Sequence, residues 1–144
     1  MILFRVDSNS LTASGHMMRC LALAEYLVQK GYKTSFLMRE PSVSSIQRVI
    51  DAGHDLIHLK STGLKKKIHG SSSLYSNYLT VSEEVDAIET GIIANNLDAV
   101  CVIVDHYALG AVWHNIVRKN CDHVVVIDDL DRLRRLRTIC LKDQ

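Results

Sequence analysis

Two stretches of the chain consist almost entirely of apolar and β-branched residues, and they restrict the possible folds most strongly. Residues 99–104 read Ala-Val-Cys-Val-Ile-Val, and residues 123–127 read His-Val-Val-Val-Ile. Strands of this composition are buried on both faces, which is typical of parallel sheets covered by helices on both sides. The rest of the chain alternates short apolar runs with segments of helical periodicity, as such a fold requires.

These patterns predict an α/β fold, a Rossmann-like parallel sheet with helices on both faces. Strands are expected at residues 2–6, 33–38, 55–59, 99–104 and 123–127, and helices at residues 16–30, 44–52, 80 to 95 or 96, and 109–119. Gly31 and Gly53 stand where the first two helices should end, a common position for glycine. Thr80 and Glu83 have the spacing of a capping box that would begin the third helix. Trp113 is expected to pack the fourth helix onto the sheet.

The size and charge of the chain limit the class of protein. A chain of 144 residues fits one domain, 1–144, and buries enough surface to fold without a disulfide or a metal. Its formal net charge of +1 argues against a nucleic-acid-binding surface. The four cysteines form no C-x-x-C pair, and we interpret them as reduced thiols. With no signal peptide and no apolar run of about 20 residues, we expect a cytoplasmic protein that does not enter a membrane.

Polar segments follow three of the expected strands. They are residues 7–16, then Asp105-His106-Tyr107, and then Asp128-Asp129-Leu130. Ligands of open parallel sheets bind at the carboxyl ends of the strands. The order of elements alone therefore predicts that these segments form the functional site.

Gly15 and His16 stand at the expected start of the first helix. The loop before them is rich in small and hydroxyl residues, and the N–H groups of such a helix start can bind an anion. The loop has neither the glycine pattern of dinucleotide-binding folds nor the lysine of a Walker A loop. A helix N-terminus disfavours the protonated imidazole, which suits a neutral general base. The alternative for His16 is a hydrogen bond within the loop and no chemistry.

The aspartates at the other two strand ends leave several functions open. Asp105 could cap the next helix, orient a neighbouring histidine or bind a sugar hydroxyl. Asp128 and Asp129 could hold Mg²⁺. Adjacent strand residues point to opposite faces, so at most one of these two is expected to face the cleft.

Five blocks of the sequence resemble a known enzyme family. Phe4-Arg5-Val6-Asp7 and Gly15-His16-Met17-Met18-Arg19-Cys20 resemble the opening of the PseG family, nucleotide-sugar hydrolases of pseudaminic-acid biosynthesis that are related to two-domain GT-B glycosyltransferases. Later blocks fit in order, and they are Asp86-Ala87-Ile88-Glu89-Thr90, Val104-Asp105-His106-Tyr107 and Ile127-Asp128-Asp129-Leu130. The resemblance spans nearly the whole chain, and its most specific parts are G-H-x-x-R-C and D-H-Y.

The resemblance implies hydrolysis of a UDP-linked 2,4-diacetamido-2,4,6-trideoxy hexose. Water would attack the anomeric carbon with inversion, UDP would leave, and His16 would be the catalytic base. The implied substrate contacts are Arg5, Asp7, Gly15, Arg19, Asp105, His106, Tyr107 and Asp128. Neither a metal nor a cofactor is expected, because a neutral histidine can move the proton and backbone N–H groups can hold a diphosphate.

The resemblance also implies that part of the enzyme lies elsewhere. In GT-B-like enzymes a second domain supplies most of the nucleotide pocket, and Asp143-Gln144 resembles the end of the family's first domain. We therefore expect the N-terminal half of a GT-B-like architecture without its C-terminal nucleotide-binding domain, incomplete as an enzyme unless a separate C-terminal domain joins it. The chain also departs from the family, because Ala13 replaces a glycine and residues 131–137 lack the family's histidine.

Two alternatives to the hydrolase remain open from the sequence. The chain could be an inert domain that serves as an interaction module or a homodimer, with the basic residues between Arg132 and Arg137 as its contact surface. It could also be half of a glycosyltransferase, in which a sugar acceptor takes the place of water.

Overall fold

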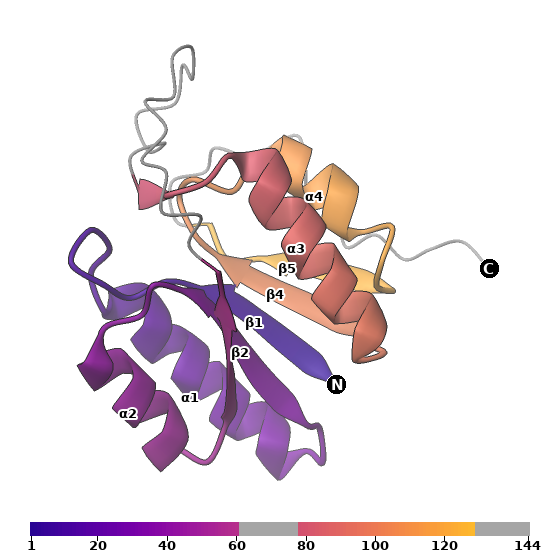
Figure 1. The fold of residues 1–144 in the computed structure, drawn as a ribbon. Helices are drawn as coiled ribbons and strands as arrows, with labels where there is room; N and C mark the ends of the chain where they lie inside the picture. The colour runs from indigo at the N-terminus through magenta and orange to yellow at the C-terminus, as the bar shows by residue number, and fades with distance from the viewer. Residues whose placement is uncertain (61–77, 129–144) are drawn as a thin grey trace.

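Within the part of the chain that the structure describes, a five-stranded sheet forms the frame of the fold (Figure 1). The computed structural model describes residues 1–60 and 78–128. All strands are parallel and lie in the order β3-β2-β1-β4-β5. Their bounds are β1 Ile2–Val6, β2 Thr34–Arg39, β3 Asp55–Leu59, β4 Cys101–Asp105 and β5 His123–Val126. The sequence predicted all five strands to within two residues.

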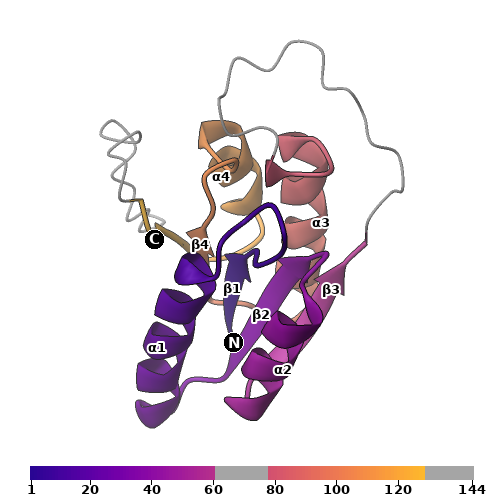
Figure 2. The same cartoon turned by 90° about the vertical axis from the view of Figure 1, so that its left-hand side faces the viewer.

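Helices cover both faces of the sheet, as the turned view in Figure 2 shows. α1 (Gly15–Gln29) and α2 (Val43–Asp51) pack on one face, and α3 (Glu83–Asn96) and α4 (Ala111–Val117) pack on the other. Gly31 and Gly53 follow the first two helices with φ angles of 89° and 82°, a conformation that glycine adopts without strain. The predicted Rossmann-like sheet with helices on both faces is confirmed.

The start of α3 differs from the prediction. Ser82 is the N-cap residue, and its hydroxyl accepts a hydrogen bond from the N–H of Val85 at 3.2 Å. Glu83 instead accepts hydrogen bonds from the N–H groups of Gly110 and Trp113, at 2.7 and 3.0 Å. The predicted capping box of Thr80 and Glu83 is therefore wrong, because the start of α4 takes the Glu83 carboxylate.

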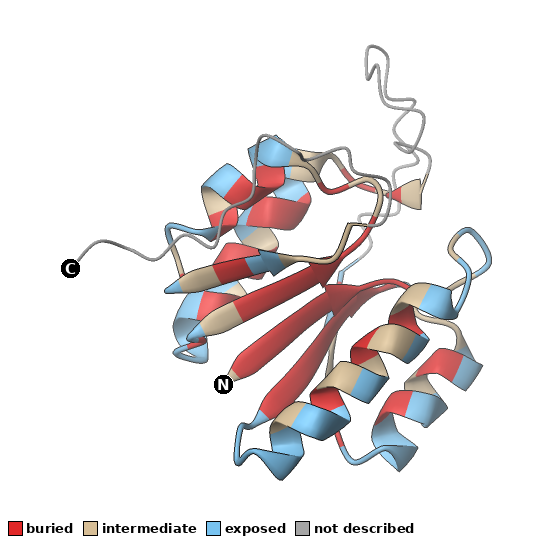
Figure 3. Cartoon of the chain, turned by 180° about the vertical axis from the view of Figure 1, so that it is seen from behind, coloured by how far each residue is buried: buried red, intermediate tan, exposed pale blue. Residues whose placement is uncertain are grey.

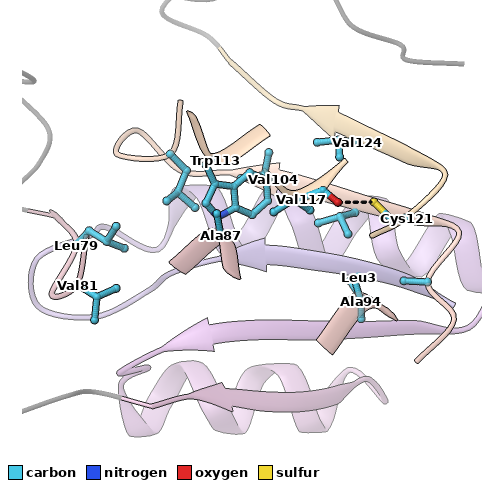
Figure 4. Packing of buried hydrophobic residues seen from close by; sticks show 13 residues of the cluster. Leu3, Leu79, Val81, Ala87, Ala94, Val104, Trp113, Val117, Cys121 and Val124 are labelled. Atoms are coloured by element: carbon cyan, nitrogen blue, oxygen red, sulfur yellow. Dashed lines mark hydrogen bonds between the residues drawn. The ribbon is translucent and has the colours of Figure 1, made fainter. Parts of the chain in front are cut away.

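Alternate residues of β1 serve the two faces of the sheet. Ile2, Phe4 and Val6 pack with α1 and α2, and Leu3 packs with α3 and α4. Figure 3 shows the central strands as the most buried part of the fold. On the second face Trp113 is fully buried in the hydrophobic cluster drawn in Figure 4, which confirms its predicted packing role.

The described cysteines are consistent with the expected reduced state. Cys20 and Cys101 are free thiols, Cys121 donates hydrogen bonds to the carbonyl oxygens of Val117 and His123, and Cys140 lies outside the described residues. Burial raises the pKa of Cys101 to about 11, which keeps its thiol protonated at neutral pH. In the part of the chain that the structure describes, no helix has the length and apolar character needed to cross a membrane.

His114 in α4 makes the stability of the fold depend on pH. The side chain is buried, and its Nε2 has no hydrogen-bond partner among the described residues. Burial lowers the pKa of His114 from 6.5 to about 4, against the opposing charge of Asp128. Between these pH values the imidazole of His114 binds a proton in the unfolded chain but not in the folded chain. The free energy of unfolding is therefore expected to fall by about 3 kcal/mol as the pH drops from 6.5 to 4, with no further loss from this group below pH 4.

Urea denaturation at pH 7 and at pH 4.5 tests this prediction. His114→Phe should remove most of the difference in unfolding free energy between the two pH values. Burial also lowers the pKa of His54, so a smaller difference of the same sign should remain in the variant. His58 is exposed on β3, and His58→Phe is the matched control that should leave the difference unchanged. An undiminished difference in His114→Phe would contradict the role of His114.

Candidate functional site

The segments that follow β1 and β4 meet at the carboxyl end of the sheet. The chain leaves β1 toward β2 on one side and later returns to β4 on the other, and ligands of such sheets bind in the crevice at this point. In Figure 2 the loop between β1 and α1 lies at this end of the sheet. A cavity of about 210 Å³ opens there, and its lining consists of Asp7, Leu11, Thr12, Ala13, His16, Tyr78, Asp105, His106 and Tyr107.

His16 lies in the first turn of α1 and contacts the end of β4. Its Nδ1 lies 2.5 Å from Oδ1 of Asp105. An ionised carboxylate can only accept hydrogen bonds, so Nδ1 carries the proton and donates it. In the neutral imidazole Nε2 is then the nitrogen with the free lone pair, which a general base requires. The Tyr107 ring packs edge-on against the imidazole, with centroids 4.5 Å apart, and limits its rotation.

Arg19 binds the same carboxylate, one helical turn after His16. Its Nη2 lies 2.7 Å from Oδ1 of Asp105, and its Nε donates to Oδ2. Burial raises the pKa of Asp105, but the hydrogen bonds from Arg19 and His16 outweigh burial and hold this pKa below its ordinary value. Asp105 therefore stays ionised at neutral pH and keeps the proton of His16 on Nδ1.

His106 also lines the cavity, but both of its ring nitrogens are engaged. Nδ1 accepts a hydrogen bond from the N–H of Ala108 at 3.0 Å, so Nε2 carries the proton and donates it to Oδ2 of Asp7 at 2.9 Å. Among the described residues, His16 is therefore the cavity histidine that keeps a ring nitrogen available to a substrate.

Behind Asp7 lies a buried network of two arginines and two aspartates. Arg5 is fully buried, and its guanidinium lies 2.6 Å from Oδ1 of Asp7 and 2.6 Å from Oδ2 of Asp86. Arg39 donates its backbone N–H to Oδ1 of Asp7 at 2.8 Å and its Nε to Oδ2 of Asp86 at 3.1 Å. Each buried charge thus has at least one partner of opposite sign, as burial of charges requires.

Asp86 connects this network to the helices above it. It lies on α3, is fully buried, and accepts a hydrogen bond from Nε1 of Trp113 at 2.9 Å in addition to those from the arginines. Burial raises the pKa of Asp86, but Arg5 and Arg39 outweigh burial and hold it below its ordinary value. The same balance holds for Asp7, where burial acts against Arg5 and the hydrogen bond from His106.

The structure brings together five of the nine residues predicted for the site. Those that line the cavity are Asp7, His16, Asp105, His106 and Tyr107. Arg5 is not among the lining residues, because its guanidinium lies behind Asp7 and is shared with Asp86.

The other three predicted residues also lie outside the cavity lining. Gly15 opens α1, and a β carbon built there would meet no atom within 4 Å, so close packing does not require glycine. Arg19 contacts Asp105 directly. Asp128 is half-buried just after β5.

Four lining residues were not predicted individually. Leu11, Thr12 and Ala13 belong to the loop that was expected to border the site, but their side chains carried no chemical signal. Tyr78 follows a segment without helical or strand periodicity, so the sequence offered no way to place it. Asp86 was noted only within a family motif, although it is the most buried carboxylate near the site.

A metal site at the end of β5 finds no support among the described residues. Within residues 1–60 and 78–128, no group of three or more histidine, cysteine, aspartate or glutamate side chains is placed to bind a metal ion. Asp129, the second carboxylate of the predicted pair, lies outside the described residues.

Comparisons with known proteins support the fold. No family model matches the chain, and no curated protein matches its sequence. A solved structure that does match is MurG from Acinetobacter baumannii, a GT-B glycosyltransferase, with a TM-score of 0.56 and 12% sequence identity. The match covers 87% of this chain but only 34% of the MurG chain. At this identity the likeness shows a shared fold, that of part of a GT-B glycosyltransferase.

Proposed function

We propose that this chain is the base-bearing half of an enzyme that transfers a sugar from a nucleoside diphosphate to a hydroxyl acceptor. The observation that carries the proposal is the hydrogen bond between Nδ1 of His16 and Asp105, which leaves Nε2 as a base beside the cavity. The likeness to part of MurG supports a glycosyltransferase half in particular.

The proposed reaction needs a single proton transfer from the chain. The acceptor oxygen attacks the anomeric carbon, its O–H proton passes to Nε2 of His16, and the bond from that carbon to the diphosphate oxygen breaks. The nucleoside diphosphate leaves with the bonding electrons. Asp105 stabilises the imidazolium that forms, because its carboxylate accepts a hydrogen bond from Nδ1–H throughout and carries the opposite charge.

The size of the cavity fits a single sugar ring. Pockets that hold drug-sized ligands measure roughly 300–1,000 Å³, whereas this cavity measures about 210 Å³. Tyr78, Tyr107 and Leu11 supply apolar walls against which a ring could lie. We therefore assign the nucleotide to a second domain, in the same protein or in a separate partner.

A second candidate is the hydrolase that the sequence motifs resemble, in which water replaces the acceptor. One observation favours it, namely that residues of its two most specific motifs are in contact. His16, Arg19 and the Sγ of Cys20, at 3.9 Å, all reach the carboxylate of Asp105. The two candidates share the base and differ only in what it deprotonates.

His16→Ala is expected to lower the release of nucleoside diphosphate from a nucleotide sugar by about 10²–10⁴-fold, the usual contribution of a general base. The release of nucleoside diphosphate is measured with a panel of nucleoside diphosphate sugars, in the presence and in the absence of monosaccharide acceptors. His58→Ala removes an exposed histidine on β3 and should leave the rate unchanged.

The products distinguish the two candidates. Release that depends on an acceptor and yields a disaccharide indicates transfer, whereas release in its absence with ¹⁸O from labelled water in the sugar indicates hydrolysis. Full activity in His16→Ala would contradict both candidates. So would a wild-type chain that releases no diphosphate and whose cavity residues show no NMR shift with any donor or acceptor.

A further inference from the structure

Arg19 was expected to contact the substrate, but its guanidinium contacts Asp105 and indicates a different role. Its guanidinium binds both oxygens of Asp105, and its Nη2 lies 3.1 Å from Nδ1 of His16. Asp105 is 1% exposed, whereas the Arg19 side chain is 36% exposed. A solvent-facing cation thus binds a buried carboxylate, and that carboxylate is the one that orients His16.

The geometry makes Asp105 a shared partner. Oδ1 of Asp105 accepts hydrogen bonds from Nδ1 of His16 and from Nη2 of Arg19, at 2.5 and 2.7 Å. A fork of two parallel N–H groups fixes a carboxylate in position and orientation more firmly than a single donor does. Without the two hydrogen bonds from Arg19, the position of Asp105 would depend largely on its hydrogen bond with His16, which is the residue that Asp105 orients.

The charge of Arg19 also acts on the imidazole. A protonated His16 would gain from the negative charge of Asp105, 2.5 Å from Nδ1, and lose from the positive charge of Arg19, whose Nη2 lies 3.1 Å from the same nitrogen. Among the described residues, the other titratable groups near the pair are Tyr107 at the edge of the ring, Cys20, whose Sγ lies 3.9 Å from Oδ2 of Asp105, and, across the cavity, Asp7, His106 and Tyr78. Asp7 and His106 are already paired with each other, so Asp105 and Arg19 are the charges that bear most directly on His16.

We propose that Arg19 is a positioning residue that acts through Asp105: it fixes the carboxylate against Nδ1 of His16 and offsets part of its charge, so that Nε2 is the ring nitrogen left to act as a base. This inference rests on the proposed function only where it concerns turnover. The state of the imidazole can be measured without a substrate.

The test follows the imidazole signals of His16 by NMR over a pH titration of the full chain. In Arg19→Met the midpoint of the His16 titration is expected to move up by roughly one pH unit or more, because the carboxylate then acts on the ring without a competing cation. Arg19→Lys keeps the cation but lacks the fork, and should move the midpoint less. Arg48→Met removes an exposed arginine on α2 and should leave the midpoint unchanged.

A kinetic arm separates positioning from substrate binding. If Arg19 acts on the base, Arg19→Met shifts the acidic limb of the kcat profile to higher pH by the same amount and leaves KM nearly unchanged. A rise in KM with an unmoved His16 midpoint would overturn the inference and return Arg19 to a substrate contact. If the midpoint moves but no preparation turns over a nucleotide sugar, the inference stands and the proposed function fails.

Discussion

Asp86→Ala is expected to lower the free energy of unfolding by about 3–5 kcal/mol, the usual cost of removing one partner of a buried ion pair. Without Asp86 the fully buried Arg5 keeps, among the described residues, only Asp7 as a partner of opposite charge, and the indole N–H of Trp113 loses this acceptor. Arg39 retains Glu89 and is affected less. Since domains are stable by only about 5–15 kcal/mol, the variant should be close to unfolding at room temperature.

Urea denaturation followed by circular dichroism measures this loss. Glu84→Ala removes the same charge from the same helix at an exposed position, and it should change the unfolding free energy by less than about 0.5 kcal/mol. Asp86→Asn keeps the shape of the side chain but not its charge. Its loss of unfolding free energy should lie between those of Asp86→Ala and Glu84→Ala. A loss below 1 kcal/mol in Asp86→Ala would mean that the network does not hold α3 to the sheet.

Asp105→Asn is expected to cost as much activity as removal of the base itself, about 10²–10⁴-fold. Arg19 and His16 both donate to Asp105, whereas an amide offers only one acceptor oxygen. When the amide nitrogen faces His16, Nδ1 must become an acceptor and the proton moves to Nε2. The imidazole then presents a donor where the reaction needs a base.

Two measurements check this second prediction. ¹⁵N NMR of the imidazole should show the Nδ1–H form in the wild type and a large fraction of the Nε2–H form in Asp105→Asn. The rate of diphosphate release should fall in parallel, while the exposed Asp122→Asn serves as a control with neither change. A variant with wild-type tautomer and wild-type rate would show that Asp105 does not orient His16.

The order and bounds of the strands could be predicted because period and composition are local properties. β4 and β5 could be recognised because apolar and β-branched residues dominate them, and Gly31 and Gly53 mark helix ends through their backbone conformation. The start of α3 could not be predicted in the same way. Its outcome depends on Glu83 reaching the N–H groups of α4, 27 and 30 residues further along the chain.

The site shows the same division between local and distant causes. The rule that ligands bind at the carboxyl ends of strands predicted that three polar segments would form the site. Residues of the first two segments, His16 and Asp105 among them, line the cavity, whereas Asp128 of the third does not. The family resemblance implied that Arg5 would contact the substrate. Its side chain instead pairs with Asp86, 81 residues away, and no local pattern reveals such a partner.

The two histidine–aspartate pairs at the cavity run in opposite directions between the same two segments. The first segment gives Asp7 to His106, and the second gives Asp105 to His16. Neither segment can therefore be replaced alone, because each replacement would leave one imidazole and one carboxylate of the remaining segment without their partners. A transfer of this site onto another Rossmann-like scaffold would therefore have to include all four side chains. A chimera that carries only three of them would leave one of the three without its hydrogen-bond partner.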